Sequence, residues 1–319
     1  MQVGAGLQAA GAHVRYDTQY QMTRVIKTLL VSAFLAALLA SCGAPPAGAG
    51  SGTLQVIAGE NFWGSIAAQL GGSHVTVTSI VTNPNTDPHE YESSATDARA
   101  FATAGYVVLN GAGYDAWASK LLSANPNQKR KVFSVADLVN KKAGDNPHFW
   151  YNPDWVDQVA DKITADYRAL DPADAAYFTQ QREALTTALK PYHDAIAHLR
   201  ATYTGVAVGS TESIFVYLAQ ALGFNLISPP EFMQAISEGT DPPAQTVAQF
   251  QDQISHRQIK VLIYNTQTST PITDNLKQLA TQNGIPVVGI SETVQPATAS
   301  FQDWQIGQLN SLKSALSRQ

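Results

Sequence analysis

Hydrophobic positions along the chain follow two alternating patterns. From residue 54 onwards, short runs rich in β-branched and aromatic residues alternate with longer stretches whose apolar residues recur at helical spacing. Strands separated by helices of about ten or more residues need crossover connections, so this order predicts a mostly parallel sheet with helices on both faces. The scheme runs twice. The chain therefore predicts an α/β fold of two lobes, each a mostly parallel four-stranded sheet with flanking helices.

The expected elements follow directly from this pattern. In the first lobe we expect strands at 54–58, 75–80, 106–109 and 131–134, and helices at 63–70, 96–104 and 153–170. In the second lobe we expect strands at 206–209, 224–227, 261–264 and 286–290, and helices at 213–222, 243–256, 272–283 and 301–316.

One long helix is predicted between the two lobes. Residues 171–200 fit a helix with Asp171 as N-cap and Pro172 at the first helical position, and Pro191 is expected to kink it. About thirty residues at 1.5 Å each span roughly 45 Å, the length of a lobe pair. A helical connector is stiffer than a pair of strands, so we expect small adjustments around a fixed cleft rather than large hinge closure. We assign 53–170 to the N-terminal lobe, 171–201 to the linking helix and 202–319 to the C-terminal lobe.

The first part of the chain has the layout of a secretory signal. Two cations, Arg24 and Lys27, precede an apolar run at 28–40, which is followed by Ser41 and Cys42. The run is too short to span a bilayer comfortably. The alternative is a buried apolar helix with an incidental cysteine.

These features divide the first residues into three segments. Residues 1–21 are polar and patternless before a second methionine, and we interpret them as an over-long start. Residues 22–41 are predicted to be the signal peptide and to take no part in the fold. Residues 42–52, rich in Gly, Ala and Pro, are predicted to be a flexible tether.

Composition excludes several classes of function. The chain has 20 Lys and Arg against 25 Asp and Glu, a net charge of -5, which argues against a nucleic-acid binder. Hydrophobic residues make up 45% and charged residues 14%, enough apolar material for a sizeable core. A single cysteine excludes an intramolecular disulfide, a zinc ribbon and an iron–sulfur cluster. Any metal must therefore be held by nitrogen and oxygen.

Four metal-competent residues lie in loops that the predicted sheets bring together. His89 follows the strand at 75–80, and His148 lies just before the helix at 153–170. Glu212 and Glu292 each come directly after a strand of the second lobe. Ligands bind beyond the carboxyl ends of parallel strands, so two imidazoles from one lobe would meet two carboxylates from the other. Taken singly, each residue has an ordinary explanation as a solvated or helix-terminal group; the set is the signal.

The remaining histidines give no comparable pattern. His193 and His198 lie five residues apart on the linking helix, on different faces, and we expect both to be solvated. His13, His74 and His256 have no carboxylate or histidine neighbours at a usable spacing.

The four ligand segments resemble those of a known family. Asp-Pro-His-Glu-Tyr-Glu at 87–92, Asn-Pro-His-Phe-Trp at 146–150, Glu-Ser-Ile-Phe at 212–215 and the late Glu292 are similar to the ligand segments of the cluster A-I metal-binding lipoproteins. These are the substrate-binding subunits of bacterial zinc and manganese ABC importers. The likeness covers about residues 53–318, and residues 39–42 resemble the lipobox of bacterial lipoproteins.

The resemblance implies a function and a place in the cell. It implies a divalent cation held between the lobes by His89, His148, Glu212 and an acidic fourth ligand, which we take to be Glu292. It implies a lipid anchor at Cys42 on the extracytoplasmic side of the membrane, and an ABC permease with its ATPase as partners. We expect a monomer without enzymatic activity.

Departures from the family pattern concern the neighbours of the ligands. The family often has Asp where this chain has Asn146 and Asn152, Pro where it has Ser93, and Asp where it has Glu292. The two asparagines are expected to support ligands or to cap helices. Glu292 has the longer side chain, so Asp303 or a water is the alternative fourth ligand.

The cargo stays open between two metals, and other functions are kept as alternatives. Carboxylates suit Mn²⁺ and imidazoles suit Zn²⁺, so two of each favour the two ions about evenly, with Fe²⁺ third. A surface adhesin or a metal sensor of the same fold would share the site. A secreted metallohydrolase is disfavoured, because four protein ligands leave little room for a catalytic water.

Overall fold

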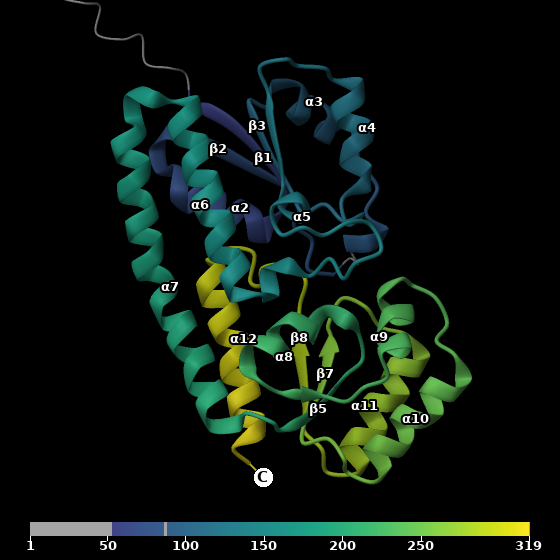
Figure 1. Cartoon of the computed structure of the whole chain (residues 1–319). Helices are drawn as coiled ribbons and strands as arrows, with labels where there is room; N and C mark the ends of the chain where they lie inside the picture. Colours follow the sequence, from purple (N-terminus) through teal and green to yellow (C-terminus); the bar gives the residue numbers. More distant parts are fainter. Residues whose placement is uncertain (1–52, 86–87, 319) are drawn as a thin grey trace, which may run out of the picture. The chain divides into compact units, whose positions relative to one another are not determined.

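The computed structural model describes residues 53–85 and 88–318. In this part the chain forms two α/β lobes joined by one long helix, α7 (Ala175–Tyr203), as Figure 1 shows. Both sheets are four-stranded and wholly parallel, so the predicted fold class is confirmed. The expectations for 1–21, 22–41, 42–52 and Cys42 lie outside the described residues. None of the described helices combines the length and hydropathy that crossing a bilayer would require.

The N-terminal sheet has the strand order β2-β1-β3-β4. Its central strand β1 buries Val56, Ile57 and Ala58 in succession, as a parallel strand covered on both faces does. The strands are β1 (Leu54–Glu60), β2 (Val75–Val81), β3 (Tyr106–Leu109) and β4 (Lys131–Ser134). The helices are α2 (Asn61–Gly71), α3 (Ala95–Thr103), α4 (Ala116–Ala124), α5 (Val135–Leu138) and α6 (Pro153–Leu170).

The C-terminal sheet repeats this arrangement in the order β6-β5-β7-β8. Its strands are β5 (Ala207–Ser210), β6 (Asn225–Leu226), β7 (Leu262–Asn265) and β8 (Val287–Ile290). The helices are α8 (Val216–Leu222), α9 (Pro230–Ser237), α10 (Ala244–Ser255), α11 (Pro271–Gln282) and α12 (Phe301–Leu316). Short 3₁₀ turns η1 (Gly72–His74), η2 (Pro88–Glu90), η3 (Phe149–Tyr151), η4 (Pro172–Asp174) and η5 (Ser213–Phe215) join several elements.

Local sequence explains where several helices begin. The side-chain oxygen of Asn152 accepts hydrogen bonds from the backbone N–H groups of Asp154 and Trp155, and Pro153 stands at the first position of α6. This confirms the capping role that we expected for Asn152. Ser300 caps α12 by accepting from the N–H of Asp303.

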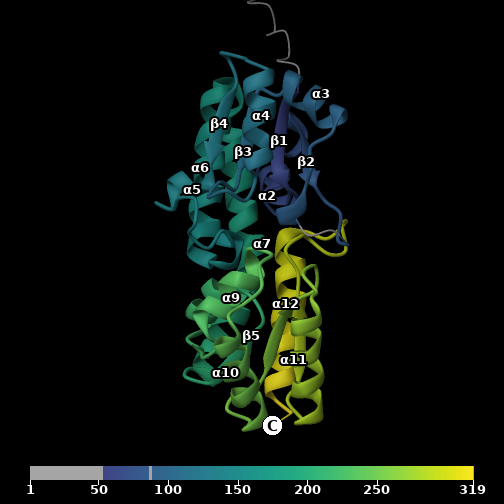
Figure 2. The ribbon, with the colours of Figure 1, turned by 90° about the vertical axis from the view of Figure 1, so that its right-hand side faces the viewer.

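The two lobes share one buried core on the side of α7. The last helix, α12, packs against α7, β8 and α2, and Figures 1 and 2 show it running along the C-terminal lobe. Trp63 and Trp150 of the first lobe belong to the same buried cluster as Phe215 and Trp304 of the second. A continuous core resists separation of the lobes, which is consistent with the small adjustments that we expected.

The linking helix begins later than predicted. Asp171 and Pro172 do not start α7; residues Pro172–Asp174 form the turn η4, and α7 begins at Ala175. The reason is tertiary: the Asp174 carboxylate lies 3.0 Å from Nδ1 of His74, which holds the preceding turn against the first lobe. The helix then continues through Pro191.

Three of the described helices, α4, α5 and α9, were missed, and several strand ends differ by one or two residues. Helices α4 and α5 are short, and α9 begins at the second proline of the pair Pro229-Pro230. Such a pair favours a break in the chain, although proline also fits the first helical turn. Strands β5 and β7 end one residue later than predicted, at Ser210 and Asn265.

Candidate metal centre

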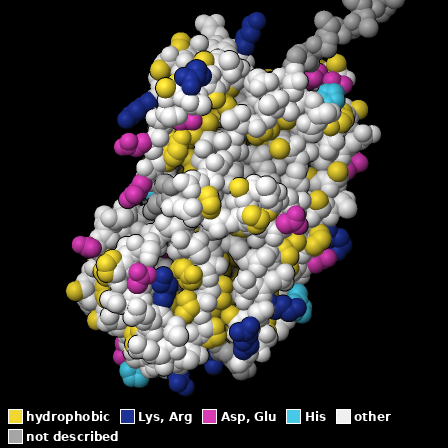
Figure 3. All heavy atoms as spheres, turned by 180° about the vertical axis from the view of Figure 1, so that it is seen from behind, with side chains coloured by type: hydrophobic (Ala, Val, Ile, Leu, Met, Phe, Trp, Pro, Cys, Tyr) yellow, Lys and Arg dark blue, Asp and Glu magenta, His cyan; other side chains and the backbone are white. Residues whose placement is uncertain are grey.

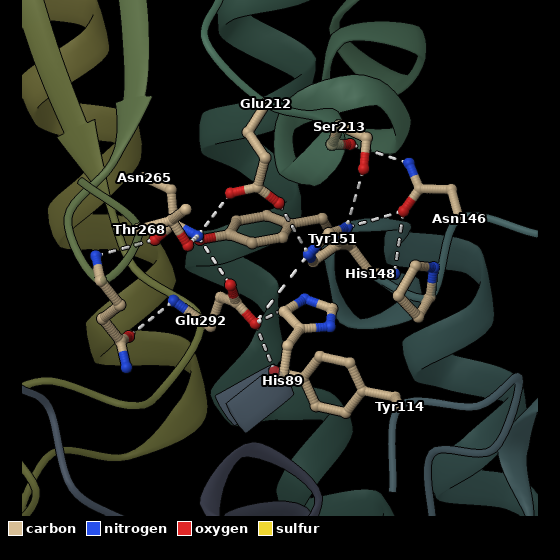
Figure 4. Close-up of polar contacts among 12 residues, drawn as sticks. His89, Tyr114, Asn146, His148, Tyr151, Glu212, Ser213, Asn265, Thr268 and Glu292 are labelled. Atoms are coloured by element: carbon tan, nitrogen blue, oxygen red, sulfur yellow. Dashed lines mark hydrogen bonds and ion pairs between the residues drawn. The ribbon is translucent and has the colours of Figure 1, made fainter. Parts of the chain in front are cut away.

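Four side chains meet between the two lobes. One ligand atom from each of His89, His148, Glu212 and Glu292 lies within 4.8 Å of the other three. Figure 4 shows the two imidazoles facing the two carboxylates. Ligands 2.0–2.2 Å from a tetrahedral ion stand about 3.3–3.6 Å apart, so an ion would need only a modest contraction of this group.

The ends of the strands bring these residues together. His89 lies in η2 after β2, and Glu212 and Glu292 each stand two residues after the end of their strands, β5 and β8. His148 precedes η3 in the connection between α5 and α6. Because the carboxyl ends of parallel strands meet at one edge, the two sheets point these loops toward each other.

Asn146 sets the orientation of the His148 ring. Its Oδ1 accepts the backbone N–H of His148 at 3.1 Å, and its Nδ2 donates to the Ser213 carbonyl at 2.8 Å. These two backbone groups fix which end of the amide is which. The oxygen therefore faces Nδ1 of His148 at 2.7 Å, so Nδ1 carries the proton and Nε2 keeps its lone pair.

His148 is held as a neutral imidazole. The side chain is fully buried, and burial together with the nearby His89 holds its pKa well below the usual range. Its Nε2 lies 3.3 Å from Oε1 of Glu212 and 3.9 Å from Oε2 of Glu292. A neutral ring with a lone pair aimed at two carboxylate oxygens has the form that a metal ligand requires.

His89 stands on the accessible side of the group. Its side chain is 24% exposed, whereas the side chains of the other three are fully buried. Nε2 of His89 lies 3.5 Å from Oε2 of Glu292, and the same oxygen accepts a short hydrogen bond from the Tyr114 hydroxyl. His89 and Tyr114 also line a cleft of about 680 Å³ whose walls come from both lobes. Of the four clustered residues, His89 is the one that lines this cleft.

An amide group joins the two glutamates. Nδ2 of Asn265 lies 2.5 Å from Oε2 of Glu212 and 2.6 Å from Oε1 of Glu292. Gln267 supports the loop after β8 that carries Glu292, because its Oε1 accepts hydrogen bonds from the backbone N–H groups of Glu292 and Thr293.

Two further carboxyl groups are buried beside the centre. Glu60, at the end of β1, is fully buried, and burial followed by the charges of Asp115 and Glu292 raises its pKa well above the usual range. Burial also raises the pKa of Asp115, although its carboxylate accepts the backbone N–H groups of Asn110 and Gly111. Asp115 thereby shapes the loop that carries Tyr114.

Other residues considered from the sequence lie elsewhere. Asp303, the alternative to Glu292, accepts from the Ser300 hydroxyl at the start of α12 and is not among the clustered residues. His198 is exposed, and His193, 36% exposed, has its Nε2 3.2 Å from Asp157; neither is among the clustered residues.

Two histidines have carboxylate partners that we did not expect. His74 pairs with Asp174 at 3.0 Å, a contact between residues distant in sequence. His256 pairs with Asp252 at 3.0 Å, one helical turn earlier, a spacing that the sequence analysis overlooked.

Sequence reasoning also missed two supporting residues, Asn265 and Tyr114. A signal for Asn265 was present, because it follows the predicted strand at 261–264 as Glu212 and Glu292 follow theirs. The candidates predicted from the sequence were carboxylates and histidines, and amide side chains at strand ends were not among them. Tyr114 gave no comparable signal, since its position depends on the loop held by Asp115.

The outer surface is mixed in charge. On the face shown in Figure 3, Lys and Arg side chains lie interspersed with Asp and Glu among mostly uncharged residues. The density of ionisable groups at the candidate centre therefore contrasts with their scattered placement on this face.

Comparisons with known proteins identify a family and relatives to which this chain is similar. The model of one protein family, described as zinc-uptake complex component A, periplasmic, matches residues 56–315. A manganese-binding lipoprotein, MntA of Bacillus subtilis strain 168, is 27% identical over 245 residues, which cover 72% of this chain and 77% of the relative.

Two solved structures share the fold. The manganese-bound periplasmic metal-binding protein of Candidatus Liberibacter asiaticus has a TM-score of 0.67 at 19% identity, covering 82% of this chain and 98% of that one. The laminin-binding adhesin Lmb of Streptococcus agalactiae has a TM-score of 0.67 at 20% identity, covering 82% of this chain and 99% of that one.

Proposed function

We propose that this chain, which belongs to the family of periplasmic zinc-uptake component A proteins, captures one divalent transition metal ion between its lobes and delivers it to an ABC-type importer. The relative MntA, named a manganese-binding lipoprotein, supports metal binding as the shared property. A role in transport rather than catalysis agrees with the four-residue centre, which leaves little room for the open position that a hydrolytic metal needs.

One observation carries the proposal. His89 and His148 from the first lobe and Glu212 and Glu292 from the second place four ligand atoms within 4.8 Å of one another. Three of these side chains, those of His148, Glu212 and Glu292, are fully buried. Buried carboxylates that face the neutral imidazole of His148 call for a cation, because it would neutralise charge that burial otherwise makes costly.

The donor set restricts the cargo to a few ions. Two imidazoles and two carboxylates suit Zn²⁺ and Mn²⁺, with Fe²⁺ as a third candidate. The intrinsic order of affinities favours Zn²⁺ over Mn²⁺ at almost any such site, so binding strength alone does not identify the physiological cargo.

Calorimetry on the purified, metal-stripped chain tests the proposal. We expect one equivalent of Zn²⁺ and one equivalent of Mn²⁺ to bind saturably and to exclude each other. Glu212→Ala should weaken both, and Asp303→Ala, the matched change outside the cluster, should weaken neither. Absence of saturable binding of both ions would overturn the proposal.

Delivery requires attachment and partners. We propose a lipid anchor at Cys42, an extracytoplasmic location, and a membrane permease with its ATPase as the recipients of the metal from a monomeric carrier. A binding protein does not itself supply the energy for uphill movement of a cation, so a separate ATPase must. Metal uptake by cells in metal-poor medium should therefore fall when this chain is deleted and return when it is restored.

A second candidate function is adhesion at the cell surface. The fold match to the laminin-binding adhesin of Streptococcus agalactiae favours it over a metal sensor or a secreted metallohydrolase. A strain that lacks the chain but takes up Zn²⁺ and Mn²⁺ normally when both are scarce would move adhesion ahead. Loss of binding to host matrix proteins in the same strain would then support it.

A further inference from the structure

Asn265 is fully enclosed between the two glutamates of the candidate centre. It is the last residue of β7 and is 1% exposed. Its amide nitrogen lies 2.5 Å from one oxygen of Glu212 and 2.6 Å from one oxygen of Glu292, as Figure 4 shows. A single NH₂ group thus bridges both carboxylates.

The backbone fixes the direction of this amide. Oδ1 of Asn265 accepts the backbone N–H of Gln267 at 3.0 Å. A backbone N–H can only donate, so Oδ1 must face Gln267 and the NH₂ group must face the carboxylates. Nδ2 also lies 3.1 Å from Oγ1 of Thr268, on the side away from the histidines.

Each carboxylate consequently directs its two oxygens to different partners. Oε2 of Glu212 faces the amide, while Oε1 lies 3.3 Å from Nε2 of His148. Oε1 of Glu292 faces the amide, while Oε2 lies 3.5 Å from Nε2 of His89. Turning either carboxylate so that both oxygens reach one ion would pull it from the amide.

This arrangement distinguishes metals by coordination number. Zn²⁺ accepts four ligands in a tetrahedron, whereas Mn²⁺ prefers about six, mainly oxygen, and gains from carboxylates that offer both oxygens. We infer that Asn265 is a positioning residue that holds Glu212 and Glu292 as one-oxygen ligands and thereby favours Zn²⁺ over Mn²⁺. The inference rests on the proposed function and deepens it by naming a residue that sets the relative affinities of the centre for the two metals.

The test compares Asn265→Ala with the wild-type chain for Zn²⁺, Mn²⁺ and Co²⁺ separately. Zn²⁺ affinity should fall about 10–100-fold, the usual effect of losing a group that orients a ligand. Mn²⁺ affinity should fall less or rise, so that the Zn²⁺ to Mn²⁺ affinity ratio falls at least about tenfold. The visible spectrum of bound Co²⁺ should change from the intense bands of four-coordination to the weak bands of higher coordination.

Asn61→Ala is the matched control. Asn61 is also a buried asparagine, and it supports the same loop through both backbone groups of Val294 without contacting either carboxylate. This variant should weaken Zn²⁺ and Mn²⁺ in parallel and leave the Co²⁺ spectrum four-coordinate. If Asn265→Ala proves unstable, Asn265→Asp keeps the acceptor for Gln267 but replaces the NH₂ group by an oxygen and adds a negative charge. The new oxygen repels both carboxylates instead of holding them, so this variant should shift the ratio in the same direction.

The outcomes separate the two claims. A wild-type chain that binds neither Zn²⁺ nor Mn²⁺ overturns the proposed function, and the inference falls with it. A wild-type chain that binds both, with an affinity ratio and a Co²⁺ spectrum unchanged in Asn265→Ala, overturns the inference alone. An equal shift of the Zn²⁺ to Mn²⁺ affinity ratio in Asn61→Ala also overturns the inference, because general loosening of the loop after β8 would then explain the shift.

Discussion

Asn146 should control metal affinity through the His148 ring. Two substitutions separate the effect of losing its hydrogen bonds from the effect of adding a negative charge at this position. The wild-type side chain holds the backbone N–H and Nδ1 of His148 and reaches across to the Ser213 carbonyl. Asn146→Ala removes all three interactions, whereas Asn146→Asp keeps the two that orient the histidine and loses the one that joins the lobes.

The expected magnitudes follow from these contacts. Each hydrogen bond contributes about 0.5–1.5 kcal/mol net, so Asn146→Ala should lower the free energy of unfolding of the metal-free chain by about 1.5–3 kcal/mol, toward the low end because Asn146 is half-buried. A freed imidazole should bind Zn²⁺ about 10–100-fold more weakly. Asn146→Asp should cost about 1–3 kcal/mol of stability, because a carboxylate oxygen then faces the Ser213 carbonyl. Its negative charge should nevertheless strengthen Zn²⁺ binding, by up to about tenfold, by raising the basicity of His148.

The assay combines zinc competition against a chromophoric chelator with urea unfolding in chelator-treated buffer. Asn152→Ala is the matched control, because this asparagine of the same segment caps α6. It should lose about 0.5–2 kcal/mol of stability and leave zinc affinity unchanged. Equal weakening of zinc binding by Asn146→Asp and Asn146→Ala would refute the proposed route through the imidazole.

Three further predictions concern ligands, acid stability and anchoring. His89→Ala and His148→Ala should abolish stabilisation by added Zn²⁺ in thermal unfolding, whereas His193→Ala and His198→Ala should retain it; equal loss in all four would contradict the ligand assignment. Burial opposes ionisation of Asp166, but hydrogen bonds from Lys131, Lys162 and Tyr106 outweigh this effect and lower its pKa. The stability that ionised Asp166 contributes is therefore present above about pH 4 and is lost as the pH falls through the lower pKa of the folded state. Asp166→Asn should cost about 1–3 kcal/mol near neutral pH and flatten the loss of stability in acid, measured by urea unfolding between pH 2 and about 7; an unchanged slope would exclude Asp166 as its source. Cys42→Ala should release the protein from the membrane and leave metal affinity unchanged. Glu212→Ala should weaken metal binding and leave the protein on the membrane; cell fractionation and metal-binding measurements test both.

The strand pattern made most of the fold and the candidate ligands predictable. Each buried strand is a run of β-branched or aromatic residues, and parallel strands carry their following loops to one edge. Glu212 and Glu292 were found for this reason, because their chemistry and their place after a strand are both visible in the sequence. His148 was found through its context before α6.

Other features depend on contacts between residues far apart in the chain. The start of α7 was wrong because Asp174 is drawn toward His74, which lies 100 residues earlier. The bridging role of Asn265 depends on the register of β7 beside β8, which brings Asn265 level with Ile290 and so close to Glu292. No local pattern expresses that register, since it is set by the packing of the whole sheet.

The four candidate ligand atoms lie close together in the structure, and this bears on how the proposed carrier releases its cargo. Both imidazoles come from the first lobe and both carboxylates from the second, so separating the lobes by little more than about 1 Å would stretch bonds of 2.0–2.2 Å and weaken binding sharply. The structure opposes that separation. Tyr114 of the first lobe donates to Glu292 of the second, the Tyr151 hydroxyl donates to the Ser291 carbonyl, and a common core joins the lobes.

A centre organised in this way needs little movement to capture an ion, which favours tight binding. Release must then be driven from outside, because an ion that fits an assembled site gains nothing by opening it. Under the proposed function, that work falls to the importer, whose binding must stabilise a separated arrangement of the lobes more than the metal stabilises the closed one.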